Sequence, residues 1–432
     1  MSDRYPILRS LDPHHARIGY LGAVAMVAIR GLDAREAIKA RLQERLFERL
    51  YPGDERFQGL KDRIGPERWK SLTKEVVATR TSEEDPSAIL SAAPTADGWI
   101  YLSEFWLYDD RMPSPLGALS PEKTDRAIEL ARMTGVLLPT YELSEAGVLL
   151  RFLIENSTSI REERDANILW ARRRPALALL YLRLLLGSEM LFPFLVCEMV
   201  DRNRSSKKLA TRGEAGLLRA AVGRLRAAIG EPNDPDDMFA ARDVAEFETS
   251  ILGKPSTEEN YLRPRMEILV DLGLIGRKSA EISRNEFRWE VTEVTERTAK
   301  EWGKLSIAEN LIPQYLDRDF FGSMGKVFLA STTRPSSDDE RLFWFVRAFQ
   351  SIGREFGFTP GRTCALLACL LAFEAGIVIE IEELFDAVFE SGRGDLAKYL
   401  HFSGGSRFDR EFLIRIDAEA GPELEKRIAS NR

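Results

Sequence analysis

The residue patterns that support most enzymatic chemistry are absent from this chain. There is no Gly-x-x-x-x-Gly-Lys-Ser/Thr segment, although Gly-Lys occurs at 253, 303 and 325, so a phosphate-binding loop for nucleotides is not expected. There is no Gly-x-Ser-x-Gly elbow. No lysine has an acidic residue two positions before it, which excludes the strict Asp/Glu-x-Lys half of a common nuclease core. We therefore predict that the protein is not an enzyme.

Candidate metal ligands are few. Adjacent His14 and His15 could bind a metal, but neighbouring side chains of an extended chain point to opposite sides, so a surface loop is favoured. An acidic cluster could hold a divalent ion, but carboxylates are also typical of a helix N-terminus. Its members are Glu380, Glu382, Glu383 and Asp386. We predict no metal and no cofactor, and an enzyme with carboxylate-bound metal in the C-terminal region stays an alternative.

Two clusters of basic residues are more suggestive of function. Residues 202–226 contain eight Lys or Arg and one acid, Glu214. The second cluster, residues 276–288, carries four basic residues between two apolar stretches. Local positive charge of this kind suits contact with nucleic-acid phosphates, since each contact displaces counterions from the duplex. The alternative is a solvated helix and hairpin surface on which Lys and Arg contribute only solubility.

The elements that would position these side chains follow a pattern that occurs twice. In each copy a helix ends at a glycine, Gly135 or Gly273. A strand follows whose five residues are, in order, an aromatic residue, Glu, an aliphatic residue, Ser or Thr, and Glu. Only glycine adopts the left-handed conformation after a last helical turn without steric cost. Ser144 and Thr292 can each cap the next helix. The copies comprise residues 124–138 with 141–145 and residues 262–275 with 289–293.

Within the second copy, the spacing of apolar residues predicts an amphipathic helix. Four apolar residues recur at intervals of four, three and three, and we expect the intervening Arg263, Arg265 and Glu267 elsewhere on the surface. The apolar positions are Leu262, Met266, Leu269 and Leu272.

This order of helix, glycine turn, two-stranded wing and capped helix resembles the winged helix-turn-helix superfamily, over about 45 residues per copy. The resemblance implies that the second copy contacts duplex DNA with its helix and its wing. The predicted DNA-binding residues are Arg202, Arg204, Lys207, Lys208, Arg263, Arg265, Arg277, Lys278, Arg284 and Arg288. The first copy has almost no wing and carries acids beside Arg126 and Arg132, so we expect it to form a packing or partner surface.

Composition predicts a soluble globular protein with local nucleic-acid contacts at most. The chain has 432 residues, enough for two to four domains, with 44% hydrophobic and 30% charged residues and a net charge of −7. Cys197, Cys364 and Cys369 lie in apolar runs and are expected to be reduced core residues. With no apolar segment at its start, the chain is expected to be cytoplasmic. The apolar stretch 175–200 contains Arg183 and Glu189, which favours a buried helix pair over a membrane span.

The fold predicted is mainly α and multi-domain, with two winged-helix modules flanked by helical N- and C-terminal regions. The expected divisions are 1–95, 96–160, 165–305 and 306–432. Helices are expected at 34–51, from 120, at 174–199, 215–229, 338–356, 360–375 and 380–390, with a linker at 79–98. The segment 99–108 is compatible with a strand or a short buried helix. Residues 363–373 are apolar on all sides and must be buried.

The function predicted is a non-enzymatic, DNA-binding or DNA-associated subunit that contacts duplex DNA through the second module. The alternative is a protein-docking subunit of a larger bacterial assembly, such as a genome-maintenance or anti-phage (antiviral) defence complex, an association that rests on fold-level analogy. The expected partners are double-stranded DNA and other protein subunits, without a membrane or a small-molecule substrate.

Overall fold

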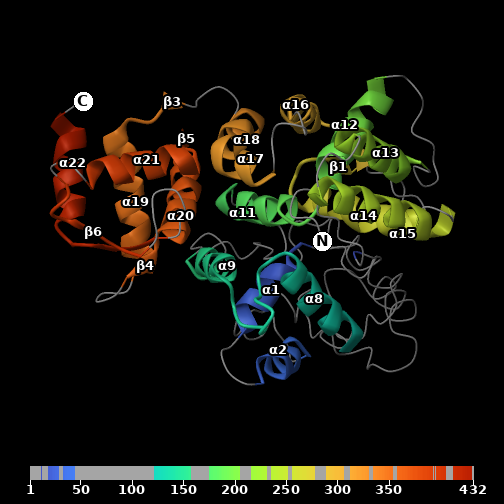
Figure 1. The fold of residues 1–432 in the computed structure, drawn as a ribbon, viewed down its shortest axis with the longest axis horizontal. Helices are drawn as coiled ribbons and strands as arrows, with labels where there is room; N and C mark the ends of the chain where they lie inside the picture. The colour runs from blue at the N-terminus through green and yellow to red at the C-terminus, as the bar shows by residue number, and fades with distance from the viewer. Residues whose placement is uncertain are drawn as a thin grey trace, which may run out of the picture. The chain divides into compact units, whose positions relative to one another are not determined.

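The computed structural model describes residues 11, 18–28, 33–43, 121–156, 175–204, 216–230, 235–251, 255–277, 289–305, 312–329, 334–353, 358–392, 394, 396–404 and 412–430. These residues are mainly helical, as predicted, with a few short strands (Figure 1). The chain divides into two compact units: Met1–Arg173 with Leu184–Glu296, and Arg174–Arg183 with Arg297–Arg432. The predicted linker 79–98 and the segment 99–108 lie outside the described residues.

The described residues of the N-terminal part of the first unit form four helices: α1 (Tyr20–Val27), α2 (Ala34–Gln43), α8 (Pro121–Met133) and α9 (Glu145–Glu155). Helix α1 is apolar and almost wholly buried, and it packs against the other three. Helix α2 buries Ile38 and Leu42, as its four-residue spacing predicts. Its described part ends at Gln43, so the rest of the predicted helix 34–51 is outside the described residues. The predicted start of the helix near residue 120 is confirmed at Pro121.

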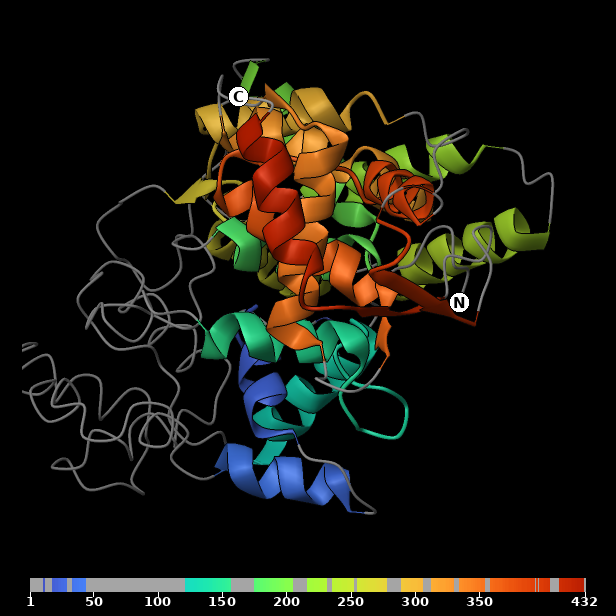
Figure 2. The same cartoon turned by 90° about the vertical axis from the view of Figure 1, so that its left-hand side faces the viewer.

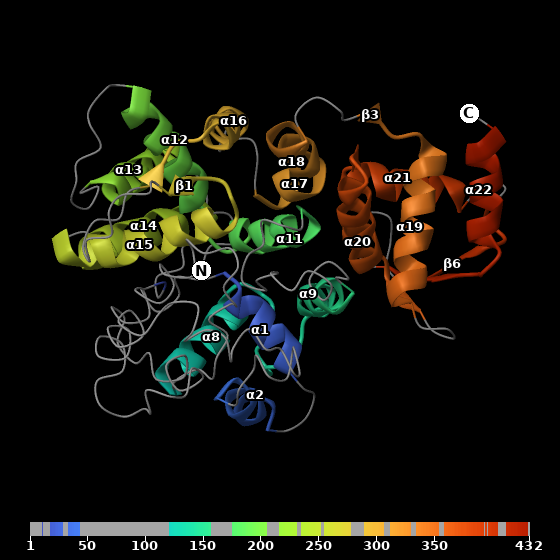
Figure 3. The same cartoon turned by 180° about the vertical axis from the view of Figure 1, so that it is seen from behind.

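The remaining part of the first unit is built on α12 (Leu191–Arg204), α13 (Leu217–Ile229), α14 (Pro235–Ile251) and α15 (Pro255–Asp271). Helix α13 packs against α12, α14 and α15, and α14 lies beside α15 (Figure 3). A short antiparallel ribbon follows, formed by β1 (Gly276–Arg277) and β2 (Trp289–Glu290), and α16 (Glu293–Trp302) begins three residues after it.

The apolar stretch 175–200 forms two helices, α11 (Pro175–Leu186) and α12, whose apolar residues are mostly buried. In the part of the chain that the structure describes, no single helix has the length and apolar character needed to cross a membrane. Taken together, α11 and α12 pass that test by length and composition, with a bend of 104° between them.

The second unit is also helical, with α17 (Ile312–Arg318), α18 (Phe320–Phe328), α19 (Asp338–Ile352), α20 (Gly361–Glu374), α21 (Ile381–Ser391) and α22 (Ala420–Ser430). Helix α19 packs against α20, α21 and α22, and Figure 2 shows α22 running along α19. Helix α19 begins with a capping box in which Ser337 and Glu340 each bond to the other's backbone N–H. Helix α20 buries ten of its residues, which confirms that the apolar segment 363–373 is internal.

Two small sheets complete the second unit. Strands β3 (Arg334–Pro335) and β5 (Ile377–Val378) pair in parallel. Strands β4 (Thr359–Pro360), β7 (Leu413–Ile416) and β6 (Leu400–Ser403) form an antiparallel sheet with β7 in the centre. The sequence did not predict this sheet, because its strands are short and β4 pairs with a strand more than 50 residues further along the chain.

Candidate nucleic-acid interface

The second copy of the repeated pattern forms a helix, a glycine turn, a ribbon and a capped helix in the predicted order. Gly273 follows α15 with a φ of 71°, in the left-handed region. Its N–H donates to the Val270 carbonyl at 3.0 Å, and the N–H of Leu274 donates to the Leu269 carbonyl at 3.0 Å. These bonds satisfy carbonyls at the end of the helix and turn the chain into β1.

One hydrogen bond joins the ribbon to the helix before it, and a side-chain cap begins the helix after it. Trp289 in β2 donates its indole N–H to the buried Glu267 carboxylate of α15 at 3.1 Å. Thr292 caps α16: its hydroxyl accepts from the N–H of Thr295 at 3.2 Å, and its own N–H donates to the Thr295 hydroxyl at 2.8 Å. The predicted cap is therefore confirmed, and the ribbon has a fixed place beside α15.

The first copy repeats these features with a shorter connection. Gly135 has a φ of 75°, and a single antiparallel bridge between Leu137 and Leu143 takes the place of the ribbon. The Ser144 hydroxyl accepts from the N–H of Gly147 at 3.1 Å, which confirms it as the cap of α9. The very short connection expected between the helix and the strand of this copy is therefore confirmed.

The burial of residues on α15 contradicts one part of the predicted DNA interface. Its apolar face is buried as expected, but Arg265 and Glu267, predicted to lie on the surface, are also buried, at 0% and 4% exposure. Between Leu262 and Leu272, Arg263 is half-buried and every other residue is buried. The helix therefore offers no exposed face along this span to enter a DNA groove.

Arg265 is an internal ion-pair residue and not a phosphate contact. Its guanidinium lies 2.9 Å from the Glu189 carboxylate, and both side chains are fully buried. It also donates to the Tyr261 carbonyl at 2.7 Å and lies 5.5 Å from the centre of the Phe247 ring. A buried charge requires such partners, because desolvation costs several kcal/mol per ion. The prediction of Arg265 as a DNA-binding residue is thus wrong.

The basic stretch 202–226 is partly neutralised by acids from other parts of the chain. Arg202 bonds to Glu198 at 2.9 Å and donates to the Gly216 carbonyl at 2.8 Å. Arg224 lies 2.9 Å from Glu198 and also contacts Asp201. The other pairs are Arg219 with Glu258 at 3.5 Å and Arg226 with Glu248 at 3.4 Å. The Arg202 guanidinium is therefore engaged by other groups of this protein. The number of basic residues in the stretch 202–226 overstates the positive electrostatic potential of the stretch.

The remaining predicted residues lie at the edges of the described structure or beyond it. Arg204 is the last residue of α12 and Arg277 belongs to β1, but the structure describes neither side chain. The others lie outside the described residues: Lys207, Lys208, Lys278, Arg284 and Arg288.

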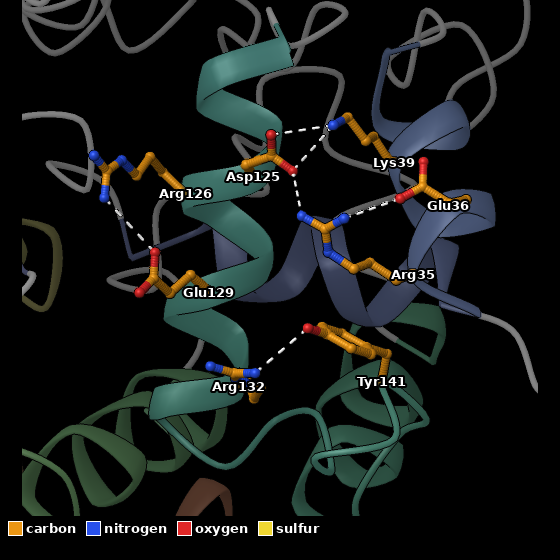
Figure 4. A network of polar contacts seen from close by, with 8 residues as sticks. All are labelled: Arg35, Glu36, Lys39, Asp125, Arg126, Glu129, Arg132 and Tyr141. Atoms are coloured by element: carbon orange, nitrogen blue, oxygen red, sulfur yellow. Dashed lines mark hydrogen bonds and ion pairs between the residues drawn. The ribbon is translucent and has the colours of Figure 1, made fainter. Parts of the chain in front are cut away.

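A polar network joins α8 of the first copy to α2 and to Tyr141 (Figure 4). Asp125 of α8 accepts from Arg35 at 2.9 Å and from Lys39 at 3.1 Å. Arg132 donates to the Tyr141 hydroxyl at 3.4 Å, and the guanidiniums of Arg132 and Arg35 lie 5.8 Å and 6.0 Å from the centre of the Tyr141 ring. This network places the basic residues of the first copy against acids and an aromatic ring.

Two helices have their N-termini capped by carboxylates that are distant in the sequence, a feature that the sequence does not reveal. Glu258 of α15 accepts from the N–H groups of Gly216 and Arg219 at 2.8 Å and 3.4 Å, at the start of α13. Glu380 accepts from Phe321 and Gly322 at 3.2 Å and 2.5 Å, at the start of α18. Burial raises the pKa of Glu380 to about 8, and the two amide donors offset this only in part.

The predicted acidic cluster is divided among structural roles. Glu380 caps α18, Glu382 pairs with Arg318 at 2.6 Å, and Glu383 pairs with Arg341 at 3.0 Å. Within the described ranges, no group of three or more His, Cys, Asp or Glu could hold a metal ion. His14 and His15 lie outside these ranges.

All three cysteines are free thiols. Cys364 and Cys369 are buried, as predicted, whereas Cys197 is half-buried. Burial raises the pKa of the Cys197 thiol to about 11, so this sulfur stays protonated at neutral pH.

Comparison with known proteins found no matching family model, no similar curated protein and no similar solved structure.

Proposed function

We propose that this protein is a non-enzymatic, DNA-associated subunit in which the two copies of the repeated pattern are diverged winged-helix modules. In this proposal the second copy contacts duplex DNA with its ribbon and not with α15. The observation that carries the proposal is the register of the ribbon: Gly276 opposite Glu290 and Arg277 opposite Trp289. This pairing makes 278–288 the connection between the two strands.

The charge of that connection supports phosphate contact. Residues 277–288 carry four basic residues against Glu281 and Glu286, in a chain whose net charge is −7. The basic residues are Arg277, Lys278, Arg284 and Arg288. Phosphate contacts carry no sequence information, so binding through the ribbon alone is expected to be independent of DNA sequence.

The test is to change Arg277, Lys278, Arg284 and Arg288 together to Ser. Loss of up to four phosphate contacts should weaken binding to a duplex of about 30 base pairs by roughly tenfold to a thousandfold at moderate salt. Affinity is measured by fluorescence anisotropy with a labelled duplex. The melting temperature should stay within about 2 °C of wild type if these side chains are on the surface.

The matched control changes Arg126 and Arg132 to Ser in the first copy of the repeated pattern. These side chains are engaged with Glu129 at 3.6 Å and with Tyr141. Their loss should leave DNA affinity within about twofold of wild type. Equal loss of affinity in both variants, or no salt-dependent binding by wild type, contradicts the proposal.

A protein-docking subunit of a larger bacterial assembly, such as a genome-maintenance or anti-phage defence complex, is the second candidate. It is favoured by the pairing of Arg202, Arg219, Arg224 and Arg226 with acids. Exposed apolar side chains in the first unit also favour it: Leu138 is 42% and Val148 is 40% exposed. Under this candidate, Leu138→Ser and Val148→Ser should abolish assembly without changing DNA affinity.

A further inference from the structure

The three-stranded sheet of the second unit has an edge with the properties of a peptide-binding site. Its strand order is β4, β7, β6, so β6 lies at an edge and, among the strands that the structure describes, bonds only to β7. An edge strand presents a row of backbone N–H and C=O groups on which an added strand can pair. Figure 1 shows β6 in the same unit as α19 and α21.

Phe402 shows that the inner face of the sheet is incompletely covered at this edge. The register places Phe402 opposite Ile414, which is 0% exposed, so both side chains project from the inner face. The Phe402 side chain is nevertheless 36% exposed. Its ring stacks on Phe389 of α21 at 5.6 Å with an interplanar angle of 23°, and it meets Phe412 at 5.6 Å. Phe402 and the half-buried Phe389 therefore form a partly exposed apolar surface along the edge.

The residues beside this apolar surface are acidic. Spacings of three and four place Asp386, Phe389 and Glu390 on one side of α21, and both acids are exposed. The opposite side of α21 is buried and apolar. A segment that covers Phe402 and Phe389 would meet negative charge next to them, which favours a basic segment.

We propose that the β6 edge binds an extended, basic segment of a partner protein as a fourth strand of the sheet. Backbone bonds to β6 hold the segment, one apolar side chain covers Phe402 and Phe389, and Lys or Arg two residues away pairs with Asp386 or Glu390. Successive residues of a strand alternate between faces, so the motif is basic, any, apolar, any, basic. This proposal does not depend on DNA binding.

The test uses the full-length protein and a fluorescent peptide, Thr-Lys-Thr-Phe-Thr-Lys-Thr, whose Phe and Lys side chains share one face as a strand. Saturable binding is expected by fluorescence polarisation. The peptide with Glu in place of Lys should bind at least about tenfold more weakly, and so should a peptide N-methylated on alternate backbone amides. Hydrogen exchange of the β6 amides should slow when the basic peptide is bound.

Two protein variants locate the site. Glu390→Lys reverses an exposed charge and should weaken binding about tenfold, whereas Glu425→Lys, at an exposed acid of α22, should leave binding unchanged. Phe402→Ser should also weaken binding about tenfold. No saturable binding, equal binding of the basic and acidic peptides, or equal effects of Glu390→Lys and Glu425→Lys would overturn the proposal.

Discussion

Several charged side chains inside this protein are held by partners that lie far away in the sequence. Two charged residues of the apolar stretch 175–200 are examples: Arg183 bonds to Asp317 at 2.6 Å, and Glu189 bonds to Arg265 at 2.9 Å. The partners are 134 and 76 residues away along the chain. Since an unpaired buried ion is costly, these residues should influence stability more than any surface charge does.

The Arg265–Glu189 pair gives the first prediction. Arg265→Met leaves a buried carboxylate without its guanidinium and should lower the free energy of unfolding by about 3–5 kcal/mol. The double variant, with Glu189→Met added, should recover most of this loss because no lone charge is left. The control Arg263→Met, at a half-buried position, should change stability by about 0.5 kcal/mol or less. Urea unfolding measures all three, and equal losses in the single and double variants would refute the pairing.

Glu380 gives a pH-dependent prediction. Burial raises its folded pKa to about 8 from the ordinary value of 4.5, so folding favours the protonated carboxyl. Its contribution to stability is complete below about pH 4.5 and is lost as the pH rises through about 8. The free energy of unfolding should therefore decline more steeply between pH 5 and pH 8 in wild type than in Glu380→Gln. Parallel profiles from urea unfolding across this range would show that Glu380 is not the titrating group.

At the scale of elements, the glycine that ends α8 has a purely conformational role. Gly135 has a φ of 75°, and a Cβ at this position would meet nothing within 4 Å. Gly223 lies in the middle of α13, also with open space around a Cβ but without positive φ. Substitutions at these two glycines therefore test the effect of backbone conformation alone, because an added Cβ is not crowded at either position.

Gly135→Ala should lower the free energy of unfolding by about 1 kcal/mol, because alanine is strained in the left-handed region. Gly223→Ala should raise it by up to about 1 kcal/mol, since glycine is a poor helix former. Thermal unfolding of the two variants provides the measurement. A loss of stability at both positions would contradict this explanation.

Local patterns in the sequence predicted local structure well. The glycine turns, the caps at Ser144 and Thr292 and the buried face of α15 depend on residues within a few positions of one another, and the structure confirms them. Burial of Arg265 could not be predicted, because it depends on Glu189 and Phe247 from other helices. The sheet that contains β6 was missed for the same reason: its pairings join residues up to 55 positions apart, Thr359 with Ile414.

At the scale of the whole molecule, the distribution of charged residues is the property that distinguishes the two candidate functions, DNA binding and protein docking. The chain carries a net charge of −7, and four arginines of its longer basic stretch, residues 202–226, are paired with acids. Any attraction to DNA must then come from a small region, for which the ribbon connection is our proposal. A small region can make only a few phosphate contacts, so affinity should be modest and strongly salt-dependent.

The salt dependence of wild-type binding tests this claim most directly. If the four basic residues of 277–288 each neutralise one phosphate, the logarithm of the binding constant should fall against the logarithm of salt concentration with a slope of about −3 to −4. Anisotropy titrations of a duplex of about 30 base pairs between roughly 50 and 200 mM salt give this slope. Our account predicts that value for any duplex sequence. A slope near zero, or no measurable binding at the lowest salt, would contradict it.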